Sequence, residues 1–168
     1  MSAENRLSFT SNVVWTEGRS GELKSRGLPT LPVSPPPEFH GREGAWTPEH
    51  LYVGSVASCF MATFTAIAEL TKLEFKSLSI EAEGKLEKTG GSGYEITEIV
   101  LKPTLVILHS ADLERAARTL EKAEKNCFIS NSIKSKVRLV PRVYHDQNPV
   151  YPCPTVVDPD AASARSEC

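Results

Sequence analysis

Cys59 is the residue whose type and surroundings best suit it to chemistry in this chain. It lies within WTPEHLYVGSVASCFMATF, a segment with no charged residue from Leu51 onward. Attack on an electrophile needs the thiolate. A free cysteine has a pKa of about 8.5, so only a small fraction of it is thiolate at neutral pH. Burial among Val56, Phe60 and Phe64 would raise that pKa further. We therefore expect Cys59 to react only where a fixed cation contacts it, and arginine fits best because it stays charged when desolvated.

Other kinds of reactive site find little support in the sequence. The cysteines contain no CxxC pair, which argues against a zinc site or a disulfide scaffold, and the histidines have no metal-ligand spacing. GSVAS lacks the second glycine of a nucleophile elbow, and KTGGSG is typical of a hairpin turn. We expect no cofactor and no metal. The residues concerned are Cys59, Cys127, Cys153 and Cys168, and His40, His50, His109 and His145.

The composition is that of one globular domain. The chain has 168 residues, 40% of them hydrophobic and 24% charged. Nineteen basic and 21 acidic residues give a net charge of −2, so we expect neither nucleic acid nor an anionic membrane as a partner. The first residues, MSAENRLSFT, lack the features of a signal peptide. The cytoplasm is therefore the expected location.

The first part of the chain predicts two strands and a long helix. Residues 6–33 read as strand, GRSG turn and strand, followed by an extended proline-rich connection rather than a central strand. A helix is expected from Thr47, a good N-cap before Pro48, to about Leu70.

The second part predicts a hairpin, a helix and a final strand. FKSLSIEAEGKLEKTG and YEITEIVLKPTLVIL form the hairpin, residues 110–125 an amphipathic helix, and NCFISNSI a break with a short second helix. KVRLVPRVYH is the last strand. The order β-β-α-β-β-α-β predicts an α+β domain over residues 1–145, and residues 146–168 are expected to be an extended or disordered tail without a catalytic role for its cysteines.

The uncharged helix indicates a dimer. A helix without a polar face is expected to be buried on every side, and one small domain can hardly cover it alone. Gly54, Ser58 and Ala62 recur every four residues, a ridge of small side chains that would let a second copy approach closely. The alternative is that these residues fit a tight monomeric core. A membrane span is disfavoured because glycine, serine and threonine dilute the apolar run.

The two cysteine motifs resemble those of the OsmC/Ohr family of osmotically inducible and organic hydroperoxide resistance proteins. TPEHLYVGSVASCF and, after a charged helix, NCFISNSIK carry the resemblance, which covers roughly residues 6–143 and favours the OsmC-like branch. It implies an intertwined homodimer with a long buried central helix. It also implies an antioxidant stress-response peroxidase in which Cys59 attacks organic hydroperoxides and Cys127 resolves. Residue 128 is Phe where the family usually has proline.

The resemblance also implies an arginine and a glutamate at the thiol. Arg19, in GRSG, resembles the arginine of the hydroperoxide-resistance branch, and Arg42, in FHGREG, lies nearer to that of the other branch; we favour Arg19 and keep both. Glu49 would anchor the guanidinium. Glu49 and Cys59 are about 15 Å apart along one helix, so one arginine cannot join them within a chain. We therefore expect Glu49 to come from the partner subunit.

The expected cycle forms a sulfenic acid on Cys59 and then a disulfide with Cys127, which an external dithiol, for example one of lipoyl type, reduces. The start of a short helix would help to hold the Cys127 thiolate. Apolar walls would select bulky alkyl or aryl hydroperoxides. The alternatives are a non-catalytic dimeric binder of small apolar ligands and a thiol redox switch on the same fold.

Overall fold

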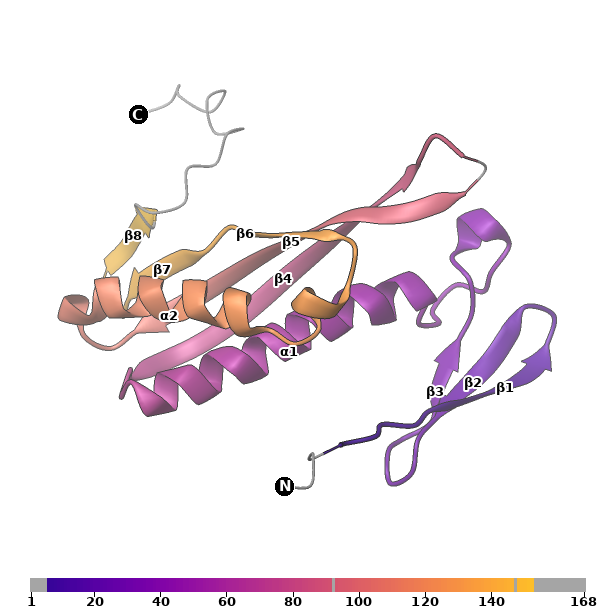
Figure 1. The fold of residues 1–168 in the computed structure, drawn as a ribbon, viewed down its shortest axis with the longest axis horizontal. Helices are drawn as coiled ribbons and strands as arrows, with labels where there is room; N and C mark the ends of the chain where they lie inside the picture. The colour runs from indigo at the N-terminus through magenta and orange to yellow at the C-terminus, as the bar shows by residue number, and fades with distance from the viewer. Residues whose placement is uncertain (1–5, 92, 147, 153–168) are drawn as a thin grey trace. The chain divides into compact units, whose positions relative to one another are not determined.

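The computed structural model describes residues 6–91, 93–146 and 148–152, and the chain divides into two compact units (Figure 1). The first unit is Met1–Tyr52 and the second is Val53–Cys168. The helix α1 (Pro48–Leu70) begins in the first unit and continues in the second. Each unit is described by itself.

The first unit contains a small antiparallel sheet in the order β1-β2-β3. Gly18, with φ of 52°, occupies the two-residue turn between the first two strands, a conformation that glycine adopts without strain. The third strand forms inside the segment expected to be only a connection. It contains Pro32 and is tolerated because it lies at the sheet edge. The elements are β1 (Asn12–Glu17), β2 (Ser20–Lys24), β3 (Leu31–Val33) and the 3₁₀ helix η1 (Pro37–Phe39).

The helix α1 begins and ends where the sequence predicts. The Thr47 hydroxyl accepts a hydrogen bond from the His50 amide at 3.2 Å, as an N-cap does, and Pro48 takes the first helical position. Within the chain only one stripe of the helix is fully buried, formed by Val56, Phe60, Phe64 and Ala68. Burial on every side is therefore not reached by the single chain.

By length and composition, α1 is the one helix of the described residues that could cross a membrane, with a hydropathy of 1.6 over its most apolar window. This is weak evidence for a span, because core helices pass the same test. The aromatic ring of Phe64 packs edge-to-face on that of Phe75 in β4, with ring centroids 5.5 Å apart. The helix therefore contributes to a protein core.

The second unit is built on a mixed five-stranded sheet with the order β4-β5-β7-β8 and β6 also paired with β5. The strands β4 and β5 form an antiparallel hairpin, and both β6 and β7 run parallel to β5. The expected last strand is thus two strands, separated at Val140 and Pro141, where proline supplies no amide for the ladder. The bounds are β4 (Phe75–Lys88), β5 (Tyr94–Ile107), β6 (Lys136–Leu139), β7 (Arg142–His145) and β8 (Asn148–Pro152).

The helix α2 (Leu113–Asn126) is the crossover that these parallel strands require, and it follows the 3₁₀ helix η2 (Ser110–Asp112). Its buried side carries Ala116, Leu120 and Ala123. The chain then passes through the 3₁₀ helix η3 (Ser130–Ser132) into β6. This connection carries the second cysteine motif.

The segment after residue 146, expected to be a tail, starts with an ordered strand. The strand β8 pairs antiparallel with β7, so this part of the chain extends the sheet. Residues 153–168, with Cys153 and Cys168, lie outside the described residues.

Candidate active site

Cys59 lies on α1 beside the buried stripe and is itself only half-buried. Its neighbour Phe60 is fully buried and fixes the rotation of the helix, which leaves Cys59 at the margin of the core. The Thr63 hydroxyl donates to the Cys59 carbonyl oxygen at 2.9 Å, one turn further along. A half-buried thiol at this margin can be reached by a small reactant.

Cys127 lies at the C-terminal end of α2 and is fully buried. Its amide still donates to the carbonyl oxygen of Glu124 at 3.3 Å, but its ψ of 116° takes the chain out of the helix. Cys127 therefore precedes the expected short helix by three residues. It is the C-cap of α2, and η3 begins only at Ser130.

Hydrogen bonds hold the turn that follows Cys127 in one conformation. The Asn131 amide donates to the Cys127 carbonyl oxygen at 3.1 Å. The Asn131 side chain donates to the Lys125 carbonyl oxygen at 2.9 Å. The Ser132 hydroxyl donates to the Phe128 carbonyl oxygen at 2.7 Å. In the described chain no backbone carbonyl accepts from the amides of Phe128 or Ile129, so these two donors are available to another group.

That group is the sulfur of Cys59. The amides of Ile129 and Phe128 hydrogen-bond to it, and so does the side chain of Cys127. Two cysteines on separate helices are therefore brought into direct contact within one unit. Contact between the thiols is the first requirement for a disulfide between them.

These contacts decide the acidity of Cys59. Burial raises the pKa of the thiol, but hydrogen bonds from the Ile129 amide, the Cys127 side chain and the Phe128 amide outweigh it, and the pKa is lowered overall. The Thr63 hydroxyl is also in reach, although its proton is already directed at a carbonyl oxygen. The expectation that only a cation could activate Cys59 is thus too narrow, because backbone amides stabilise an anion as well.

Cys127 has the opposite shift. Burial raises the pKa of the Cys127 thiol, and the neighbouring Cys59 raises it further, while the side chain and the amide of Ser130 partly oppose them. As the pH rises, Cys59 therefore loses its proton before Cys127 does. Such an arrangement suits attack by the first sulfur and a later reaction of the second.

The other three predicted site residues belong to the first unit and are placed within that unit only. Arg19 lies in the turn between β1 and β2, and its guanidinium donates to the Phe39 carbonyl oxygen at 2.6 Å. The amide of Arg42 donates to the Ser34 hydroxyl at 2.8 Å. Glu49 lies in the first turn of α1, and its buried Oε2 atom has no hydrogen-bond partner among the described residues.

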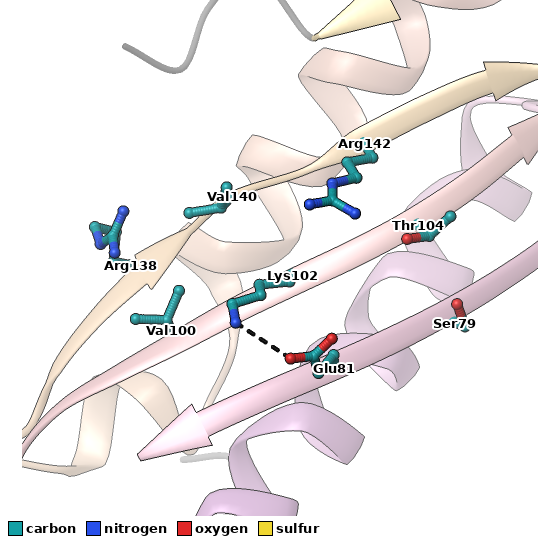
Figure 2. Close-up of a pocket in the computed structure, with 8 residues that line it drawn as sticks. All are labelled: Ser79, Glu81, Val100, Lys102, Thr104, Arg138, Val140 and Arg142. Atoms are coloured by element: carbon teal, nitrogen blue, oxygen red, sulfur yellow. Dashed lines mark hydrogen bonds and ion pairs between the residues drawn. The ribbon is translucent and has the colours of Figure 1, made fainter. Parts of the chain in front are cut away.

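A pocket with a volume of about 320 Å³ lies on the sheet of the second unit (Figure 2). Lys102 is paired there with Glu81 at 3.1 Å and with Glu83 at 2.9 Å, and Arg138 contacts Glu98 at 3.4 Å. Because these cations already have carboxylate partners, the surface resembles a solvated sheet face more than an anion site. Its lining is Ser79, Glu81, Val100, Lys102, Thr104, Arg138, Val140 and Arg142. The described residues contain no cluster of three or more potential metal ligands.

The fold is that of an α+β protein, and the comparisons with known proteins agree with this fold. The OsmC-like protein family model matches residues 40–141, and a relative from Bacillus subtilis, the uncharacterized protein YmaD, is 32% identical over 130 residues, covering 74% of this chain and 85% of the relative. The chain belongs to the OsmC-like protein family.

Solved structures show the same fold. An OsmC-like protein of unknown function from Vibrio cholerae matches with a TM-score of 0.75 at 23% identity, over 81% of this chain and 99% of that one. An organic hydroperoxide resistance protein OsmC from Legionella pneumophila matches with a TM-score of 0.63 at 25% identity, over 83% of this chain and 99% of that one.

Sequence reasoning missed three groups around the thiols, namely the amides of Phe128 and Ile129 and the hydroxyl of Ser130. Backbone amides leave no signature in residue type, so only the turn geometry reveals the first two. Ser130 stands three residues after Cys127 in the second motif, and this position was the available signal.

Proposed function

We propose that the protein is a cysteine-based organic hydroperoxide reductase in which Cys59 attacks the peroxide and Cys127 resolves the product. The observation that carries the proposal is the contact between two thiols of opposite pKa shift. Membership of the OsmC-like family supports it, as does the similarity to a Legionella protein described by its hydroperoxide resistance.

The cycle has three balanced steps. The Cys59 thiolate attacks the O–O bond, takes one oxygen as a sulfenic acid, and the alkoxide leaves as the alcohol after gaining a proton. The Cys127 thiol then attacks the sulfenic sulfur, forming the disulfide and releasing water. An external dithiol reduces the disulfide, is itself oxidised to a disulfide, and returns both protons and both electrons to the pair. Such a cycle operates in a reducing compartment, which accords with a cytoplasmic location.

Glu49 supports a role for an arginine in the same site. A buried carboxylate oxygen without a donor is costly, so its Oε2 atom calls for a cation or another donor beyond the contacts of its own unit. We assign this donor to the guanidinium of Arg19 or Arg42, which would also orient the hydroperoxide. Glu49 and Cys59 are separated along one continuous helix, so the carboxylate would act on the thiol of the partner subunit.

Exposed surfaces in each unit support the homodimer that this arrangement needs. On α1 the ridge of Gly54, Ser58 and Ala62 is exposed, and nothing lies within 4 Å of a Cβ built on Gly54. In the first unit the apolar residues Val13 and Trp15 of β1 are 61% and 71% exposed. Apolar and small-residue faces of this kind are typical of surfaces that a second copy covers.

Hydroperoxide consumption tests the proposal. With cumene hydroperoxide and dithiothreitol or dihydrolipoamide, we expect repeated turnover by the wild-type protein and none by Cys59→Ser. Consumption of one equivalent without turnover would instead indicate a redox switch. No consumption at all would favour a binder of small apolar ligands.

A further inference from the structure

The Ser130 hydroxyl is buried and has no hydrogen-bond partner among the described residues. A buried hydroxyl without a hydrogen-bond partner destabilises the folded protein, so such a group usually has a specific role toward the atoms next to it. The neighbour is the sulfur of Cys127, because both the side chain and the amide of Ser130 lower the pKa of that thiol. Ser130 therefore meets the second thiol of the site and no competing acceptor.

The same turn divides its donors between the two sulfurs. The amides of Phe128 and Ile129 reach Cys59, whereas the amide and hydroxyl of Ser130 reach Cys127. Hydrogen bonds from the amide and the side chain of Asn131 to the carbonyl oxygens of Cys127 and Lys125 hold this division in place. The unpaired Ser130 hydroxyl is thus the donor available to the Cys127 sulfur when that sulfur carries negative charge.

We infer that Ser130 is a positioning residue for the resolving step, aligning the Cys127 sulfur with Cys59 and stabilising its thiolate. The inference rests on the proposed two-cysteine cycle. In resolution, the Cys127 sulfur forms the S–S bond while the S–O bond of the sulfenic acid breaks, and the proton of Cys127 leaves with that oxygen as water. When the external dithiol attacks the sulfur of Cys59, Cys127 departs as the thiolate that Ser130 holds.

Ser130→Ala tests this role, with Ser130→Thr as the variant that restores the hydroxyl. In a single turnover with cumene hydroperoxide, we expect Ser130→Ala to consume the peroxide within about twofold of the wild-type rate but to form the disulfide about tenfold more slowly. Sulfenic acid should then accumulate and be trapped by dimedone. Equal disulfide rates in Ser130→Ala and the wild type would overturn the inference.

A second readout is independent of peroxidase activity. In a Cys59→Ser background, alkylation of Cys127 against pH reports its pKa, and Ser130→Ala should raise the midpoint by about one unit while Ser130→Thr returns it. Among the described residues, the side chains that shift the pKa of Cys127 are those of Cys59 and Ser130, so removing Cys59 isolates the effect of Ser130. This experiment can succeed even where the proposed function fails.

Ser132→Ala is the matched control for damage to the turn. It deletes a hydroxyl two residues away that bonds the Phe128 carbonyl oxygen and makes no contact with Cys127 among the interactions described. The Cys127 midpoint should stay near that of the Cys59→Ser parent. An equal rise in Ser132→Ala and Ser130→Ala would assign the effect to turn structure and contradict the inference. If Ser130→Ala does not fold, failure of Ser130→Thr to preserve the parental midpoint contradicts it equally.

Discussion

The Cys127 side chain hydrogen-bonds to the sulfur of Cys59, and the amides of the next two residues reach the same atom. The contact is unequal, because hydrogen bonds lower the pKa of Cys59 whereas burial raises that of Cys127. Cys59, the half-buried thiol, therefore ionises at a lower pH than Cys127, the buried thiol beside it. This order of ionisation is what a peroxide-attacking and a resolving cysteine need.

Site-resolved alkylation checks this asymmetry. As the pH rises, Cys59 should lose its proton below the pH at which an ordinary thiol does, and Cys127 above it, because their pKa values are shifted in opposite directions. We expect iodoacetamide to modify Cys59 first, with its midpoint at the lower pH, as read by peptide mass spectrometry. A midpoint for Cys127 at or below that of Cys59 would contradict the assignment of roles.

Phe128→Pro removes one amide donor to Cys59. Cys127 has the extended conformation that a residue before proline prefers, and the Phe128 side chain is 80% exposed, so the turn should accept the change. We expect the alkylation midpoint of Cys59 to rise by about one unit. Phe128→Ala keeps the amide and is the control. A rise of the same size in both variants would show that the side chain, and not the amide, matters.

Ala62→Arg tests the dimer. The substitution places a large charge on the exposed small-residue ridge of α1, where a second copy would have to approach closely. We expect light scattering coupled to size-exclusion chromatography to show a monomer or aggregates in place of the wild-type dimer. Ala111→Arg, at an exposed position on η2, makes the same change elsewhere and should leave the dimer intact. A monomeric wild-type protein would refute the expected assembly.

Mixed dimers test the shared site. Cys59→Ser and Glu49→Ala should each be inactive alone or nearly so, the first for lack of the thiolate and the second for lack of the guanidinium anchor. Refolded together, they should regain activity, since a mixed dimer contains one site with both Cys59 and Glu49 intact. Absence of any recovery, with mixed dimers present by mass spectrometry, would place both residues in the site of one chain.

Gly84→Ala tests the packing of α1 on β4. A Cβ at Gly84 would lie 2.5 Å from the Cγ2 atom of Val53, whose branched side chain has few other rotamers. We expect the free energy of unfolding in urea to fall by about 1–3 kcal/mol. Adding Val53→Ala should recover part of this loss, because it removes the clashing atom. Equal losses with and without Val53→Ala would show that the clash is not the cause.

The strongest local signals in the sequence predicted the fold well. Thr47 and Pro48 marked the start of α1, and the alternation of β4 and the turn after it marked the hairpin with β5. The burial of α1 was harder to predict, because an uncharged face can be covered within the chain or by a second copy, and periodicity does not separate the two. The split of the last strand follows from Pro141, whose effect on the ladder was not anticipated.

The thiols of the site were predictable, and the means of activating them was not. Cys59 and Cys127 stand in two motifs that resemble the family pattern, and the structure brings the two side chains together. Reasoning from residue types points to arginine as the activator, because a charged side chain can be identified in a sequence and a backbone donor cannot. The direction in which the Phe128 and Ile129 amides point depends on the conformation of the turn. Many different side chains are compatible with that conformation, so the residue types do not reveal it.

The order in which the chain is synthesised gives the Cys127–Ser130 turn a protective role as well. Cys59 leaves the ribosome well before residues 127–130, and until the α2 crossover closes onto β5 it lacks the amides that make it acidic. A nascent chain therefore carries Cys59 as an ordinary, mostly protonated thiol that oxidants attack slowly. Cys59 therefore becomes acidic only when Cys127, its proposed resolving partner, has reached its place beside it in the folded unit.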